Sequence, residues 1–162
     1  MLYLDNRFME VALPIIEHEE YQQMRYIKHH DESVFEHSLK VAFYSYQLAY
    51  KQNLDWKSTI RGALLHDFFL YKSKKCFSLR IITDSIKHAI IHPKIAFDNA
   101  VKFFDLNNKE ENIIKGHMFP FGFPKSKEAW IVSFVDKYIA VFEYSSNFKK
   151  MMHKKQPAYQ AE

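Results

Sequence analysis

The most constraining feature of this sequence is that histidine and aspartate residues stand on the apolar stripes of predicted helices. The stripe in segment 33–53 comprises His37, Val41, Tyr44 and Leu48. Matching stripes are Ile60, Ala63, Leu64 and Asp67 in segment 56–68, and Val132, Val135, Asp136, Ile139 and Ala140 in segment 126–144. A lone ionised carboxylate in an apolar core costs several kcal/mol, so each needs a cation, a hydrogen-bond network or a bound proton. Buried His and Asp residues on separate helices are what a metal site inside a helical bundle requires.

The rest of the chain favours the same all-α class. Only 3 Gly and 5 Pro interrupt its 162 residues, and 48% of them are hydrophobic, which disfavours disorder and a turn-rich β sandwich. We predict one domain over residues 1–162, a bundle of about six to seven helices with the metal site at its centre. The expected helices lie near 8–28, 33–53, 56–68, 78–91, 93–105, 109–117 and 126–144.

Local signals set the ends of these helices. Ser33 and Glu36 have the spacing of a capping box, and Asp55 is placed to cap the third helix. Pro93 suits a first helical position with His92 as its cap. Pro and Gly residues make segment 118–125 a loop, and the basic tail 145–162 is expected to be a solvated, frayed end.

Charge and cysteine content limit the partners and the compartment. The net charge of +4, from 23 basic and 19 acidic residues, suits an anionic small molecule and does not imply a nucleic-acid polymer. Cys76 is the only cysteine and cannot form an internal disulfide. No apolar run approaches the roughly 20 residues of a membrane span. We therefore expect a cytoplasmic protein without a membrane partner; the oligomeric state is open.

In chain order the candidate ligands are His37, the adjacent pair His66-Asp67, His92, His117 and Asp136. This order, H…HD…H…H…D, resembles the HD superfamily of metal-dependent phosphohydrolases over roughly residues 25–143, and in particular its small single-domain bacterial members. The resemblance implies an HD-domain helical bundle. It also implies a hydrolase that acts on a phosphate ester of a nucleotide or another small phosphorylated metabolite.

The resemblance also implies roles for the six residues. His37, His66, Asp67 and Asp136 resemble the minimal mononuclear set, and His92 and His117 the additional ligands of dinuclear members. With two ions, Asp67 would bridge them, and the pair His66-Asp67 would lie at the catalytic centre. Imidazole and carboxylate ligands suit two divalent Fe, Mn or Zn ions. Such a pair activates water and neutralises phosphoryl oxygens, so no protein nucleophile is required.

Other interpretations of single residues stay open. His88, one turn before His92, competes with it as a ligand, and His117 could instead stabilise the carbonyls at its helix end. Arg25, Lys40 and Lys72 are candidates for binding substrate phosphate, or are ordinary solvated basic residues.

Three alternative functions remain for the same residues. Some relatives with this His/Asp set are mixed-valent di-iron oxygenases. The same ligands serve either chemistry, and the groups around them that decide between the two are not revealed by the sequence. A mononuclear, nucleotidase-like hydrolase is the second alternative. A non-catalytic metal-binding module is the third. The chain has no phosphate-binding Gly loop of the Walker type and no Ser or Cys nucleophile motif.

Overall fold

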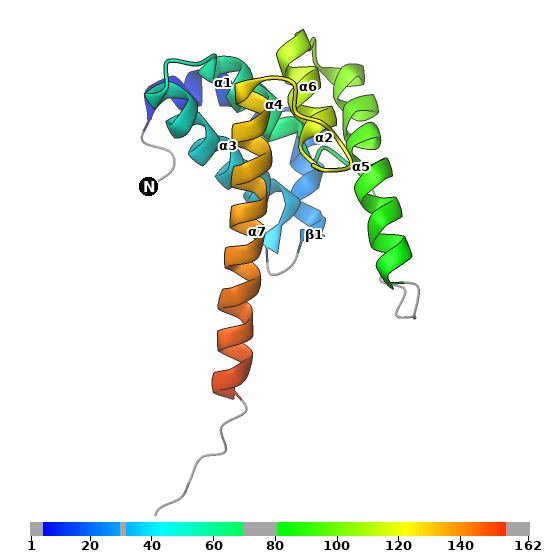
Figure 1. Ribbon diagram of the computed structural model, residues 1–162. Helices are drawn as coiled ribbons and strands as arrows, with labels where there is room; N and C mark the ends of the chain where they lie inside the picture. The colour runs from blue at the N-terminus through cyan, green and yellow to red at the C-terminus, as the bar shows by residue number, and fades with distance from the viewer. Residues whose placement is uncertain (1–4, 30–31, 70–80, 155–162) are drawn as a thin grey trace, which may run out of the picture.

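The computed structural model describes residues 5–29, 32–69 and 81–154, and it has an all-α fold, as predicted (Figure 1). A short antiparallel hairpin is the exception: β1 (Lys28–His29) pairs with β2 (Glu32–Ser33) in the register Lys28 opposite Ser33. This hairpin precedes the first helix that carries a candidate ligand. Among the described residues, no helix is long and apolar enough to cross a membrane.

The prediction of one helix over 8–28 is wrong. The chain forms α1 (Asn6–Ile16), α2 (Glu19–Gln22) and the 3₁₀ helix η2 (Gln23–Tyr26). Pro14 lies inside α1, and the break comes later, at His18, which is extended and caps α2 by accepting from the backbone N–H of Glu20 (3.3 Å). The break lets Tyr21 become fully buried in the core.

Helices α3 (Val34–Lys51) and α4 (Trp56–Leu65) follow the prediction closely. The capping box of Ser33 and Glu36 is formed, and the Asp55 carboxylate accepts from the backbone N–H of Ser58 (3.1 Å). On α3, His37 and Val41 are buried as expected, but Tyr44 and Leu48 are exposed. The buried face of α3 turns away from those two positions and continues through Ala42, Ser45, Tyr46 and Ala49.

The prediction of two helices over 78–91 and 93–105 is also wrong, because α5 runs from Ile81 to Phe103 without interruption. His92 is therefore inside a helix and is not a helix cap. Pro93 removes one backbone hydrogen bond from the helix. His92, Ala96 and Ala100 nevertheless form a buried face at four-residue spacing that starts directly before Pro93 and continues after it, so the helix is held by packing along this face despite that loss.

The last two helices are α6 (Asn108–Gly116) and α7 (Lys127–Lys154). The start of α7 agrees with the prediction, and the helix continues ten residues beyond the predicted end at 144. The expectation of a solvated, frayed tail over 145–162 stays a prediction. Residues 155–162 of that tail lie outside the described residues.

Helix α4 is central to the domain and packs against α1, α3, α6 and α7 (Figure 1). At Gly62 a methyl group would lie only 2.8 Å from the Ile113 side chain, so glycine permits the close approach of α4 and α6. These two helices run side by side, and their C-terminal ends carry His66 and His117.

Candidate metal centre

The His66-Asp67 pair lies where α4 ends. His66 is the C-cap residue, and its Nδ1 lies 2.7 Å from the carbonyl oxygen of Ala63. The Tyr21 hydroxyl donates to the next carbonyl, that of Leu64 (3.0 Å). Carbonyl groups in the last turn of a helix have no partner within the helix, so these two bonds satisfy the end of α4 and fix the His66 ring.

His117 ends α6 in the same way. It is the C-cap residue of α6, and its Nδ1 lies 2.7 Å from the carbonyl oxygen of Ile114. The carbonyl oxygen of His117 itself accepts from the Ser133 hydroxyl (2.6 Å) and from the Lys137 ammonium group (2.7 Å), both on α7. The end of α6 is therefore held to α7 beside the site.

These contacts determine which ring nitrogen of each histidine is available. A carbonyl oxygen only accepts hydrogen bonds, so Nδ1 of His66 and of His117 carries a proton, and each ring in its neutral form presents its lone pair at Nε2. For His66, whose pKa the two carboxylates raise, a metal ion would displace a second proton from Nε2. Both Nε2 atoms are buried and have no hydrogen-bond partner among the described residues. Metal-bound histidines have this arrangement, with the distal N–H bonded to a backbone carbonyl.

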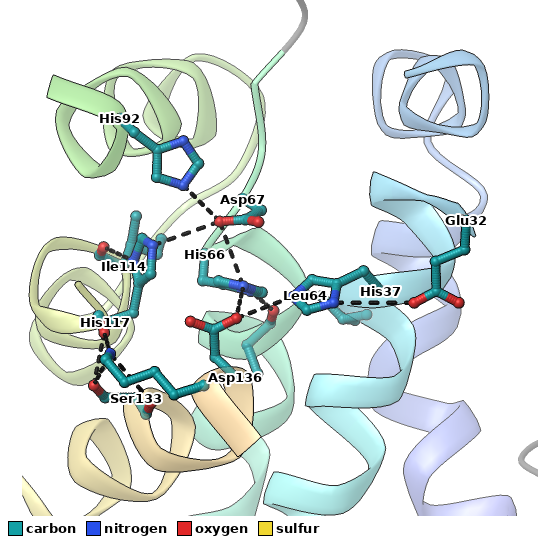
Figure 2. A network of polar contacts seen from close by, with 12 residues as sticks. Glu32, His37, Leu64, His66, Asp67, His92, Ile114, His117, Ser133 and Asp136 are labelled. Carbon is teal, nitrogen blue, oxygen red and sulfur yellow. Dashed lines mark hydrogen bonds and ion pairs between the residues drawn. The ribbon is translucent and has the colours of Figure 1, made fainter. Parts of the chain in front are cut away.

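Two carboxylates lie between the imidazole rings (Figure 2). Oδ1 of Asp67 lies 2.7 Å from Nε2 of His92, 3.4 Å from that of His66 and 3.5 Å from that of His117. Oδ1 of Asp136, on α7, lies 3.0 Å from Nε2 of His37 and 3.6 Å from that of His66. Asp67 therefore faces three histidines and Asp136 faces two.

The donor atoms form two overlapping groups. In one, His37, His66 and Asp67 each offer an atom, and in the other Asp67, His92 and His117 do, with all atoms of a group within 4.8 Å of one another. Asp67 belongs to both groups, and Asp136 adjoins the first. All six side chains are buried. Nitrogen and carboxylate oxygen donors without thiolate suit Fe, Mn or Zn, so the residues fit a divalent transition-metal site.

The charged state of the cluster follows from this crowding. Burial raises the pKa of the Asp67 and Asp136 carboxyl groups, but neighbouring histidines outweigh it and hold both pKa values well below the usual range. Burial disfavours protonated His66, yet the two carboxylates raise its pKa to about 9. Burial and the adjacent His66 lower the pKa of His117 to about 3. The buried cluster thus keeps two carboxylates ionised, which makes it attractive to cations.

All six predicted ligands come together, although they are spread over five helices or helix ends. The candidates for binding substrate phosphate differ in how close they lie to this site. Lys40 contacts the Glu32 carboxylate, which lies 4.0 Å from Nδ1 of His37, so Lys40 adjoins the site. The hydrogen bond of the Arg25 Nε is to Gln22 (2.6 Å), and the Arg25 guanidinium lies over the Phe35 ring. Lys72 and the side chain of His88 lie outside the described residues.

Sequence reasoning missed three residues around the ligands. Glu32 lies between Lys40 and His37, and Ser133 and Lys137 hold the carbonyl oxygen of His117. Ser133 and Lys137 stand one turn apart on α7, on either side of the Asp136 position. That i, i+4 spacing was a usable signal for two side chains that reach the same point. The Glu32 contact depends on the β hairpin, which the sequence did not indicate.

Comparison with known proteins agrees with this geometry. The family model described as HD domain matches residues 34–141, which span all six candidate ligands. No curated protein and no solved structure matches the chain. HD-domain proteins are generally metal-dependent phosphohydrolases, and the buried His and Asp groups here are placed to hold metal. The chain belongs to the HD domain family.

Proposed function

We propose that this protein is a phosphohydrolase with a dinuclear metal centre, which hydrolyses a phosphate ester of a nucleotide or another small phosphorylated metabolite. The observation that carries the proposal is the position of Asp67, whose carboxylate is a member of both donor groups. A mononuclear site would need only one of these groups. Two groups that share a carboxylate favour two ions, for which Fe, Mn and Zn are the candidates.

The proposal assigns the ligands by proximity. His37, His66 and Asp136 would hold the first ion and His92 and His117 the second, with Asp67 shared between them. His66 and His117 would bind through Nε2, because Nδ1 donates to a helix carbonyl. Those carbonyl contacts hold each ring in one orientation, so the two histidines need little rearrangement to bind.

The chemistry also accounts for the kind of residues present. When bound, two such ions would activate water and neutralise phosphoryl oxygens during in-line displacement. The protein then needs to orient the ligands, exclude bulk water and hold the substrate. Burial of all six ligands supports the first two tasks. For the third, Lys40 beside the site and Arg25 on η2 are the described candidates for contacting the substrate phosphate, with Lys72 as a further one.

Phosphate release from a panel of nucleotides and sugar phosphates, with Mn, Fe, Co or Zn, tests the proposal. Wild-type protein should release phosphate from at least one substrate only with metal, and Asp67→Asn should abolish that release. Asp98→Asn is the matched control, because Asp98 is an exposed aspartate on α5 paired with Lys94 (2.5 Å). No metal-dependent release from any substrate would contradict the proposal. A mixed-valent di-iron electron paramagnetic resonance signal with O₂-dependent turnover would indicate the oxygenase instead.

A further inference from the structure

The outward face of α7 carries a row of exposed aromatic side chains. Trp130, Phe134, Tyr138 and Phe142 follow one another at four-residue intervals and are 42%, 68%, 63% and 64% exposed. The rings of Phe134 and Tyr138 stack at 6.5 Å. Residues four apart lie on the same face of a helix. These residues therefore form one continuous aromatic ridge, on the side of α7 away from Asp136.

A groove runs beside this ridge, between α7 and α3. Its volume is about 720 Å³, and Tyr44 and Leu48 line its α3 side, with Phe134, Tyr138 and Phe142 on its α7 side. Tyr44 and Leu48 are 50% and 39% exposed. Their positions on an apolar helical stripe had indicated a buried face. The α3 face with Tyr44 and Leu48 is therefore apolar, yet no other described part of the domain covers it.

The area of this surface lies at the upper end of what a monomer exposes. The exposed parts of Tyr44, Leu48, Trp130, Phe134, Tyr138 and Val141 amount to roughly 600 Å² if a complete large side chain offers about 200 Å². The largest apolar patch on a typical monomer is about 300–600 Å². Specific protein interfaces bury about 600–1,000 Å² on each partner. These six side chains alone reach the lower end of that range.

We propose that this face is the interface of a homodimer, in which the α7 ridge of one copy packs in the α3–α7 groove of the other. In a two-fold dimer the same patch serves both subunits, so it must be complementary to itself. A ridge lying directly beside a groove meets that condition, because helices pack by placing ridges into grooves. Two copies related by a two-fold axis thus fill both grooves at once.

The charge of the face also fits a second copy. Among the described residues that line the groove, Lys40 is the only charged one, and its ammonium group contacts the Glu32 carboxylate. Like charges on facing patches would oppose self-association, and within the groove itself Lys40 is paired with Glu32. The exposed lysines Lys51 on α3 and Lys127 on α7 lie on the same helix faces as the aromatic residues, outside the groove lining.

Sedimentation equilibrium of the full chain tests the dimer directly. Wild-type protein should have twice the 19.4 kDa mass of one chain at concentrations on the order of 100 µM. Phe134→Glu and Tyr138→Glu should each raise the dissociation constant at least about 100-fold, because a two-fold interface contains each change twice. Tyr26→Glu is the control, since Tyr26 is 80% exposed on η2 and should leave the dimer intact.

Tryptophan fluorescence locates the interface without changing the patch. In a Trp56→Phe variant, Trp130 is the remaining tryptophan, and its emission should shift to longer wavelength on dilution as the dimer dissociates. A monomeric wild-type protein at all these concentrations would overturn the proposal. So would a dimer that both Glu variants leave intact, or a Trp130 spectrum that dilution does not change. A monomer that binds anionic phospholipid vesicles through the same residues would assign the face to a membrane instead.

Discussion

The N-terminal and C-terminal ends of helices α4 and α6 differ in the partners of their polar side chains. At their N-terminal ends, Asp55 caps α4 and Asn107 caps α6, and Lys109 links the start of α6 to the start of α7. At their C-terminal ends, His66 and His117 turn into the buried cluster around Asp67. Both ends hold the same helices together, yet among the residues that the structure describes only the C-terminal end leaves buried histidine nitrogens without hydrogen-bond partners.

Every capping group at the N-terminal end has a partner. The Asp55 carboxylate accepts from the backbone N–H (3.1 Å) and hydroxyl (2.9 Å) of Ser58. Lys109 Nζ donates to Glu128 (2.9 Å) and to Asp55 (3.3 Å), and Asn107 donates to the Ser58 hydroxyl (2.9 Å). Glu128 is almost fully buried, and its carboxylate is satisfied by Lys109 and by the backbone N–H of Asp55 (3.2 Å). This end is arranged for stability.

The C-terminal end is not optimised in that way. Nε2 of His66 and of His117 is buried without a hydrogen-bond partner among the described residues, although each ring is held by a carbonyl contact at Nδ1. A buried nitrogen without a partner costs free energy, which packing alone does not require. The contrast supports the proposal that the histidines are oriented for a ligand outside the protein chain, and divalent metal is the ligand that their chemistry suits.

Loss of the shared carboxylate should have the largest effect. Asp67→Ala removes a donor from both groups, so neither ion should bind at stoichiometric level and activity should fall by more than 100-fold, since loss of even an outer-shell partner costs about 10- to 100-fold. Metal per chain, measured by mass spectrometry, and phosphate release check this. Asp98→Ala, an exposed aspartate on α5, is the control and should keep both metal and activity. Full metal content in the Asp67 variant would contradict the proposal that Asp67 is shared by both ions.

Substitution of His92 or His117 should cause loss of the second ion and retention of the first. Either change to Ala removes a donor from the second group only, so the protein should keep one ion at His37, His66, Asp67 and Asp136. Activity should still collapse, because the proposed reaction uses both ions. Circular dichroism should show an unchanged helical fold. If these variants kept both ions and full activity, the assignment of the second group would be wrong.

A substitution at the N-terminal ends of the same helices should lower stability and leave metal binding unchanged. Lys109→Met leaves the buried Glu128 carboxylate without its strongest partner and should lower the free energy of unfolding by about 1–2 kcal/mol. Lys94→Met, which breaks the exposed pair with Asp98, should change stability by less than about 0.5 kcal/mol. Urea unfolding and metal content measured on the same samples compare the two ends. A loss of metal in the Lys109 variant would show that the ends are coupled.

The smallest expected effect is the pH dependence of the stability that the N-terminal ends contribute. Burial raises the pKa values of Asp55 and Glu128, but hydrogen bonds from Ser58 and Lys109 outweigh it, so both lie below their ordinary values of 3.8 and 4.5. Such carboxyl groups contribute stability above those ordinary values, and the contribution is lost as pH falls through the lower, folded pKa values. The stability difference between wild type and Lys109→Met should therefore be largest near neutral pH and shrink as acidification protonates Glu128 and Asp55. A difference that grows on acidification would contradict this account.

The sequence predicted which buried residues come together better than it predicted the elements that carry them. His37, Asp67 and Asp136 were found because apolar neighbours at helical spacing placed them on buried faces. His92 was assigned to a helix cap because Pro93 follows it, whereas a buried face continues through Ala96 and Ala100. A single proline changes the local preference by one hydrogen bond, and tertiary packing decides whether the helix continues.

Two other differences have a common cause. The break at His18 and the outward position of Tyr44 and Leu48 both depend on which neighbouring elements cover a given face. Helical spacing shows that residues share a face, but it does not show what that face contacts. The contacts of Ser133 and Lys137 with the His117 carbonyl depend likewise on where α6 ends against α7.

Anomalous scattering from crystals of the metal-loaded wild-type protein shows directly whether two ions bind on either side of Asp67. Data collected on both sides of the metal absorption edge identify the element and locate each ion. Two peaks are expected on either side of the Asp67 carboxylate, one beside His37, His66 and Asp136 and the other beside His92 and His117. A single peak, or none after loading with Fe, Mn and Zn in turn, would contradict this expectation.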